Sequence, residues 1–212
     1  MPKQHRFFAA IYDRMLAGTE KAGLRQMRAD LVGRARGRTL ELGAGTGLNL
    51  EHYKTAVTEL VLTEPDRFMA KRLRDRIAAE PPAPGLVDVV EAPAESLPFD
   101  DASFDSVVGT LVLCTVDDPE RVTREIARVL RDDGEFLYLE HVRDPEEGRL
   151  ARWQYRLERP WGWLAAGCHP NRATAGILAA AGFSTEPADG TLPKAGPLVR
   201  PVIHGSATPP PS

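Results

Sequence analysis

The residues with the clearest chemical potential are a glycine cluster and an acid that follows its first glycine by 21 positions. The cluster Gly43-Ala44-Gly45-Thr46-Gly47 follows the predicted strand 39–42, and a helix is expected directly after it. Glu64 follows a second predicted strand at 60–62. Because glycine lacks a Cβ, a turn built from it can approach a ligand closely and present backbone N–H groups. A carboxylate at the end of the neighbouring strand can accept both hydroxyls of a ribose. The spacing therefore predicts a site for a ribose-containing ligand.

Position 48 argues against a dinucleotide as this ligand. A Gly-x-Gly-x-x-Gly fingerprint that starts at Gly43 needs glycine or alanine at position 48, where this chain has Leu48. An acid at the position of Glu64 also serves nicotinamide cofactors, so it supports a ribose without choosing among ribosides. The alternative for the glycine cluster is an ordinary tight turn between a strand and a helix.

Three further side chains are candidates for catalysis or metal binding. His141 lies just beyond a predicted strand at 136–139, where an imidazole with a pKa of about 6.5 could remove a proton; the alternative is a hydrogen-bonded structural histidine. Cys114 and Cys168 are more typical of small buried apolar groups, and we assign neither a covalent role. Because Cys168-His169 has no further cysteine–histidine grouping beside it, the sequence predicts no metal site.

Apolar residues at regular spacing predict the elements that position these groups. Helices are expected from residue 7 to about 18 and over 20–32, which gives an N-terminal helical cover of about 1–33. Other helices are expected over 68–79, over 122–130, before Pro160, and between Asn171 as a cap and Gly182. The predicted strands are 39–42, 60–62, 86–90, 104–109 and 136–139.

Continuous apolar strands that alternate with helices predict an α/β fold with a parallel sheet and helices on both faces. We expect residues 1–205 to form a single domain. The last seven residues, 206–212, are rich in serine, threonine and proline and are expected to form a disordered tail.

Composition narrows the classes of partner. The 27 basic and 30 acidic side chains give a formal charge of −3, and the basic residues form no block that would follow a nucleic-acid backbone. The longest uncharged apolar stretch has ten residues, 107–116, well short of the roughly 20 that cross a bilayer. Two cysteines and no charged-then-apolar leader favour the cytoplasm. These features argue against a nucleic-acid partner and an integral membrane segment, and they leave a weak peripheral membrane contact and the oligomeric state open.

Several separated motifs together resemble class I S-adenosylmethionine-dependent methyltransferases. They are Leu40-Glu41-Leu42 with the glycine cluster, Glu64-Pro65, Ala94-Glu95-Ser96-Leu97-Pro98-Phe99 and Val129-Leu130-Arg131-Asp132-Asp133-Gly134. The resemblance implies a Rossmann-like, seven-stranded, mostly parallel sheet that binds S-adenosylmethionine. Pro93 departs from the pattern, because many relatives have an aspartate there. The residues that the resemblance places around the cofactor are Tyr12, Glu41, Gly43, Ala44, Gly45, Thr46, Gly47, Asn49, Glu64, Pro65, Ala94, Glu95 and Leu111.

A narrower resemblance indicates the class of substrate. The segments 109–116, 140–142, 167–168 and 198–201 are similar to alkyl-thiol S-methyltransferases. This implies in-line methyl transfer to a small apolar thiol, in which positioning matters more than proton transfer, with His141 as the candidate base. Candidate walls of an apolar substrate pocket are Phe8, Leu113, Trp153 and Trp161, although such side chains also pack in cores.

Two alternatives share the cofactor motifs. One is a methyltransferase that acts on a lipid, a quinone or another small-molecule oxygen, nitrogen or carbon nucleophile. The other is a non-catalytic module that binds S-adenosylmethionine. A nicotinamide oxidoreductase is disfavoured by Leu48.

Overall fold

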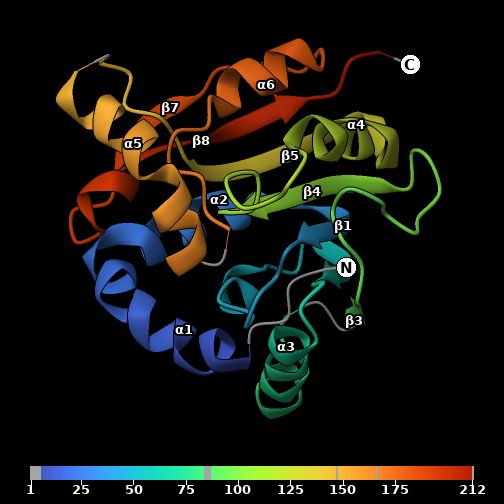
Figure 1. Ribbon diagram of the computed structural model, residues 1–212. Coiled ribbons are helices and arrows are strands. Elements are labelled where there is room, and N and C mark those ends of the chain that lie inside the picture. The colour runs from blue at the N-terminus through green and yellow to red at the C-terminus, as the bar shows by residue number, and fades with distance from the viewer. Residues whose placement is uncertain (1–5, 84–86, 147, 166, 212) are drawn as a thin grey trace.

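A computed structural model describes residues 6–83, 87–146, 148–165 and 167–211, and a twisted mixed sheet runs through its centre (Figure 1). The strands follow the order β3-β2-β1-β4-β5-β8-β6, and β7 also pairs with β8. Strands β1 to β5 are parallel, whereas β8 is antiparallel to β5. The bounds are β1 Gly37–Leu42, β2 Val57–Thr63, β3 Val87–Val90, β4 Phe104–Thr110, β5 Leu130–His141, β6 Ser184–Thr185, β7 Ala188–Thr191 and β8 Pro201–Thr208.

The predicted α/β fold is confirmed, with one refinement in the number of strands. The described residues form eight strands, but β6 and β7 both pair with the same side of β8, at its opposite ends. The sheet is therefore seven positions wide, as the family resemblance implies. All five strands predicted from apolar patterns are present; Leu86, the first residue of one prediction, lies outside the described residues.

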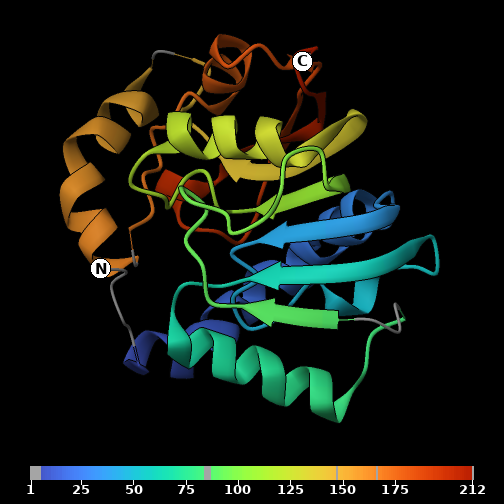
Figure 2. The ribbon, with the colours of Figure 1, turned by 90° about the vertical axis from the view of Figure 1, so that its right-hand side faces the viewer.

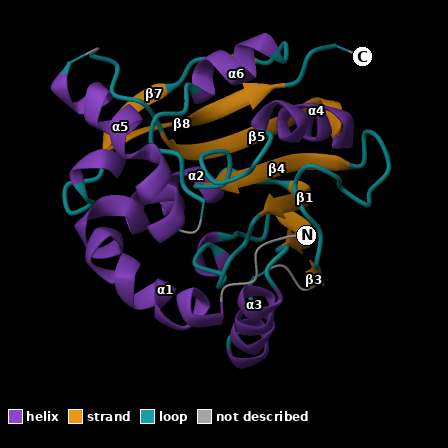
Figure 3. Ribbon diagram, viewed as in Figure 1, coloured by secondary structure: helices purple, strands orange, loops and turns teal. Residues whose placement is uncertain are grey.

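Helices cover both faces of the sheet (Figures 2 and 3). One buried cluster joins α4 and α6 to β1, β4 and β5 on one face, through residues such as Val122, Ile126 and Leu178. A second cluster joins α2 and α3 to β2 and β5 on the other face, through Leu31 and Leu73. The helices are α1 Arg6–Thr19, α2 Arg25–Val32, α3 Arg67–Ala79, α4 Pro119–Val129, α5 Arg149–Leu164 and α6 Thr174–Ala180.

Two helices begin at aspartate caps beside the carboxyl ends of strands. The Asp66 carboxylate accepts the backbone N–H groups of Phe68 and Met69 at the start of α3. Asp118 accepts the N–H of Arg121 at the start of α4, where proline occupies the first turn. These caps fix the helices directly after the loops that carry the candidate site.

The N-terminal cover has a break that helical spacing did not predict. Instead of one helix over 20–32, a π-helical turn η1 (Glu20–Leu24) precedes α2, and Gly23 within it has φ of 137°. Glycine adopts this conformation without a Cβ clash, so the chain changes direction there. Residues 1–5 of the predicted cover lie outside the described residues.

Two predicted helix boundaries are wrong. Helix α5 continues through Pro160 to Leu164; both Pro160 and Arg156 are exposed, so water can solvate the carbonyl that the proline cannot bond. Asn171 does not cap α6, which begins at Thr174, because the Asn171 amide instead donates to Glu158 at 3.0 Å.

The expectation of a disordered tail from residue 206 is wrong for its first part. Ser206 and Ala207 pair with Leu137 and Phe136 of β5, and β8 ends only at Thr208. Ala207 is buried in the sheet despite its polar neighbours. None of the described helices has the length and apolar character needed to cross a membrane.

Candidate active site

The glycine turn follows β1 at the carboxyl edge of the sheet, beside the position where the strand order reverses between β1 and β4. Gly43, Gly45 and Gly47 have φ of 55°, 59° and 84°, a region that side-chain-bearing residues rarely adopt. The expected helix after the turn is wrong, because only the three-residue 3₁₀ turn η2 (Leu50–His52) follows. The ligand-binding potential of the turn therefore comes from its open backbone rather than from a helix N-terminus.

Glu64, at the end of β2, is hydrogen-bonded to the glycine turn. Its Oε2 accepts the Gly45 N–H at 2.9 Å, and its Oε1 accepts the Asp66 N–H at 2.8 Å. Burial raises the pKa of Glu64 to about 7, although the two backbone N–H groups favour the ionised form. The acid and the turn thus form one unit.

A buried polar network lies beneath the turn. Glu41 accepts hydrogen bonds from Asn49 at 2.9 Å and from the Tyr53 hydroxyl at 2.6 Å, and burial raises the pKa of Glu41 to about 7. Arg28 donates to Asn49 at 3.1 Å and to Thr110 at 2.7 Å. Glu41 and Asn49 therefore support the turn from below.

Arg28 was not among the site residues predicted from the sequence. Its side chain is buried and forms an ion pair with Glu20 at 3.1 Å, which joins η1 to the network. A signal was present: Arg28 stands at helical spacing from the apolar residues Leu24 and Leu31, so it interrupts an otherwise apolar stripe.

A cavity of about 820 Å³ lies above this network. The order of the strands explains which residues line the cavity. Residues after β1, β2 and β3 lie on one side of the position where the strand order reverses, and residues after β4 and β5 lie on the other. The predicted residues on its wall are Tyr12, Gly43, Gly45, Glu64, Pro65, Ala94, Glu95, Leu111, His141 and Trp161. The predicted cofactor residues that it does not include are Glu41, Ala44, Thr46, Gly47 and Asn49.

The residues predicted to line the substrate pocket do not lie together in the structure. Trp161 lies on the cavity, whereas Leu113 is fully buried in the core cluster beside α4. Trp153 is 48% exposed on α5 and lies in a separate surface hollow lined by arginines. Leu113 and Trp153 are thus corrected: the spacing of α5 turns Trp153 outward, and the loop after β4 turns Leu113 inward. The Phe8 side chain lies outside the described residues.

Leu111, just after β4, has an unusual backbone on the cavity wall. Its φ is 61°, and its N–H donates to the Leu139 carbonyl at 2.7 Å. A leucine at positive φ has a strained backbone, which is kept only where the surrounding contacts hold it in place. Leu111 begins the loop that leads to Cys114.

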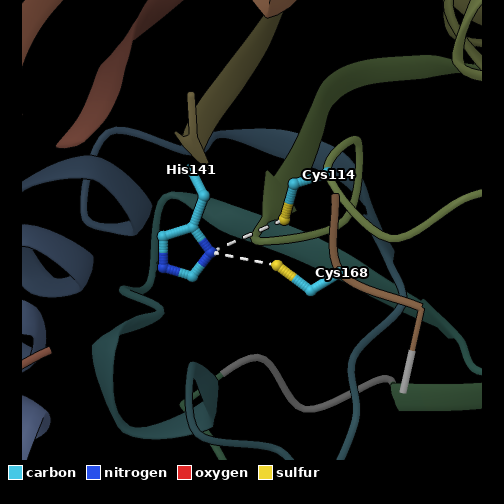
Figure 4. A group of neighbouring side chains, drawn as sticks. All are labelled: Cys114, His141 and Cys168. Atoms are coloured by element: carbon cyan, nitrogen blue, oxygen red, sulfur yellow. Dashed lines mark hydrogen bonds between the residues drawn. The ribbon is translucent and has the colours of Figure 1, made fainter. Parts of the chain in front are cut away.

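Two cysteines and a histidine meet at the cavity. The Sγ atoms of Cys114 and Cys168 each lie 3.7 Å from Nδ1 of His141 (Figure 4). Hydrogen bonding from Cys114, and next from His141, lowers the pKa of Cys168 well below its ordinary value. The sequence-based statement that no metal ligand set exists is wrong, because these residues are far apart in the chain and only the fold brings them together.

Comparison with known proteins identifies the family. A methyltransferase domain model matches residues 40–138. Thiol S-methyltransferase TMT1A of Homo sapiens is 32% identical over 201 residues, which cover 94% of this chain and 82% of the human protein. The chain belongs to the S-adenosylmethionine-dependent methyltransferases. This methyltransferase is also 34% identical over 145 residues to thiol S-methyltransferase TMT1B of Rattus norvegicus, which covers 68% of this chain and 59% of the rat protein.

A solved structure supports the fold of the methyltransferase. A methyltransferase from Thermotoga maritima superposes with a TM-score of 0.69 at 21% identity, over 96% of each chain. The cofactor of the family is S-adenosylmethionine. The backbone at Gly45 is open on the cavity side, because the nearest atoms to a Cβ added there are Gly43 O and Tyr12 Cε1, both 4.0 Å away.

Proposed function

We propose that this methyltransferase transfers the methyl group of S-adenosylmethionine to a small apolar thiol. The observation that carries the proposal is one continuous cavity that joins the glycine turn and Glu64 to a largely apolar wall with Leu111 and Trp161. The 32% identity to human thiol S-methyltransferase TMT1A, over 94% of this chain, supports the thiol.

The cofactor would lie along the β1–β3 side of the cavity. Glu64 would accept the ribose hydroxyls, and the backbone of the turn would approach the methionine moiety. Ala94 and Glu95 would lie beside the adenine, with Tyr12 and Pro65 as further wall residues. Glu41 and Asn49 would act indirectly, because they hold the turn from below.

When bound, the cofactor supplies an activated methyl group on a sulfonium. The work left to the protein is to hold the nucleophilic sulfur roughly 3–3.5 Å behind the methyl carbon and in line with the bond that breaks. Leu111 and Trp161 are suited to this, because apolar walls orient a small thiol by shape and exclude water. A thiolate and a sulfonium give neutral products, so a drier site favours the charge-dispersed transition state.

Proton removal matters in this reaction, because the thiolate rather than the thiol is the nucleophile. A simple alkyl thiol lacks the electron-withdrawing backbone that lowers the pKa of cysteine to about 8.5, so it is ionised less than a cysteine at neutral pH. His141 lies on the wall and is the candidate base for the remaining fraction.

A methyl-transfer assay tests the proposed function. Purified protein and labelled S-adenosylmethionine are incubated with alkyl thiols, amphiphilic amines and phenols, with Gly45→Val as the inactive control. We expect methyl thioethers and S-adenosylhomocysteine from the thiols. Turnover of amines or phenols alone would mean that the substrate is not a thiol. Cofactor binding without any turnover would favour a non-catalytic binding module.

A further inference from the structure

Cys114, His141 and Cys168 come from three separate segments of the chain. Cys114 lies in the loop after β4, His141 ends β5, and Cys168 follows α5. Their candidate ligand atoms all lie within 4.8 Å of one another. Figure 4 shows both sulfurs directed at the same ring nitrogen, and each lies 3.7 Å from it.

The two sulfur–nitrogen distances match an edge of a tetrahedral zinc site. Zinc–sulfur bonds of about 2.3 Å and zinc–nitrogen bonds of about 2.0–2.1 Å place sulfur and nitrogen about 3.5–3.6 Å apart at a tetrahedral angle. The observed sulfur–nitrogen separations are 3.7 Å. A hydrogen bond at Nδ1 involves one proton, which the two sulfurs would have to share. One ion at the centre would engage all three atoms.

The fold holds the three residues together independently of any ion. Glu140, next to His141, accepts the backbone N–H of Cys114 at 3.1 Å. His169, next to Cys168, donates its backbone N–H to the Cys114 carbonyl at 2.6 Å. Cys114 is therefore tied to both of the other segments. A preorganised set of this kind lowers the cost of assembling a metal site.

The ligand set is incomplete in a way that suits catalysis. Structural zinc sites have four protein ligands, whereas catalytic sites have three and keep one position for water or substrate. All three residues lie on the wall of the cavity proposed for methyl transfer. We propose that Cys114, His141 and Cys168 bind one zinc ion whose fourth position faces this cavity and takes the sulfur of the thiol substrate. The part played by the substrate rests on the proposed function.

The reaction balances without a redox partner. The thiol binds the metal through sulfur and releases its proton to water. A sulfur lone pair then attacks the methyl carbon, the bond from that carbon to the sulfonium breaks, and its electron pair stays on the sulfur of S-adenosylhomocysteine. The neutral thioether leaves, because it is a weaker zinc ligand than a thiolate. In this scheme His141 is a ligand, and the metal replaces a general base in ionising the thiol.

Cobalt titration tests the site without relying on activity. The protein is freed of metal, kept reduced with a non-thiol reductant and titrated with Co²⁺ as a spectroscopic substitute for zinc. We expect one Co²⁺ per chain, with sulfur-to-cobalt charge-transfer absorption and the visible bands of four-coordinate cobalt. An alkyl thiol should change these bands, whereas its methyl thioether should not.

Matched variants locate the ion. Cys168→Ser and His141→Ala should lose stoichiometric cobalt while keeping a native circular dichroism spectrum. His169→Ala is the control, because His169 lies next to Cys168 but its Nδ1 is 2.8 Å from Glu158. It should bind cobalt like the unaltered protein. Cobalt binding that persists without change in both Cys168→Ser and His141→Ala would overturn the site.

Other outcomes separate this inference from the proposed function. A lack of charge-transfer absorption in reduced protein would mean that the two cysteines and His141 only hydrogen-bond to one another, and it would overturn the metal site. Full thiol methylation by metal-free protein would overturn its catalytic role and leave the proposed function intact. Cobalt could bind stoichiometrically, with thiolate charge-transfer bands, while no thiol is methylated. This outcome would support the metal site and would show that a thiol is not the substrate, against both proposals.

Discussion

The carboxylate of Glu64 accepts the backbone N–H of Gly45 at 2.9 Å. This bond joins the end of β2 to the turn after β1. Since β1 and β2 are neighbouring parallel strands, their carboxyl ends meet at one edge of the sheet, and the bond fixes the distance between them. A ligand that engages one of these groups must therefore meet the other.

Cofactor affinity should depend on pH through Glu64. Burial raises the pKa of Glu64 to about 7, and the ionised form is the better acceptor for ribose hydroxyls. Binding favours the carboxylate, so affinity should fall as pH drops below about 7 and level off above it. Calorimetric titration with S-adenosylhomocysteine from pH 6 to 8.5 measures this. Glu64→Gln should weaken binding at high pH by roughly 1.5–3 kcal/mol and flatten the profile. If the affinity of Glu64→Gln still falls with pH at the same slope, the group that titrates is not Glu64.

Two glycines of the turn should respond differently to alanine. A Cβ at Gly45 has open space on the cavity side, whereas a Cβ at Gly47 would lie 2.7 Å from Leu50 and 2.8 Å from Leu73. Gly45→Ala should therefore cost only the left-handed strain of about 1–2 kcal/mol but lose much of the cofactor affinity. Gly47→Ala adds a clash and should lower the melting temperature further. If Gly45→Ala and the unaltered protein bind the cofactor with equal affinity, the turn is not part of the cofactor site.

Arg28 should contribute far more to stability than Arg25 on the same helix. Arg28 is buried and donates to Glu20, Asn49 and Thr110, so Arg28→Met removes the cation that these three groups share. Breaking such a buried pair costs about 3–5 kcal/mol. Arg25 forms an exposed pair with Glu51, for which about 0–1 kcal/mol is expected. Urea denaturation of Arg28→Met and Arg25→Met makes the comparison, and similar midpoints would contradict the role of the network.

Truncation at residue 205 should destabilise the protein. It removes Ser206 and Ala207 from their pairing with β5 and the bond from Thr185 Oγ1 to the Ser206 carbonyl at 2.9 Å. Each lost bond is worth about 0.5–1.5 kcal/mol, so a total loss of about 2 kcal/mol or more is expected. Removal of residues 211–212 alone is the control and should leave the melting temperature unchanged. If both truncations melt like the full chain, the end of β8 contributes nothing.

The sequence by itself determined the first five strands and most of the helices, in their order, whereas β6, β7 and β8 were not predicted. Apolar runs such as 60–62 and helical stripes such as that of Val122, Ile126 and Val129 depend on neighbours a few positions apart, so they can be recognised before the fold is known. The glycine turn and Glu64 were found for the same reason, because their spacing follows from one strand and one crossover. The motifs also carried the family and the cofactor.

Only the tertiary structure decided which distant residues meet. The Cys114–His141–Cys168 cluster depends on the pairing of β4 with β5 and on where the chain after α5 returns, and no local pattern contains that information. The same holds for Arg28 beneath the turn and for Ala207 in β8. Local periodicity fixes the face that a side chain occupies on its own element, whereas its neighbours across the sheet depend on pairings between segments far apart in the chain.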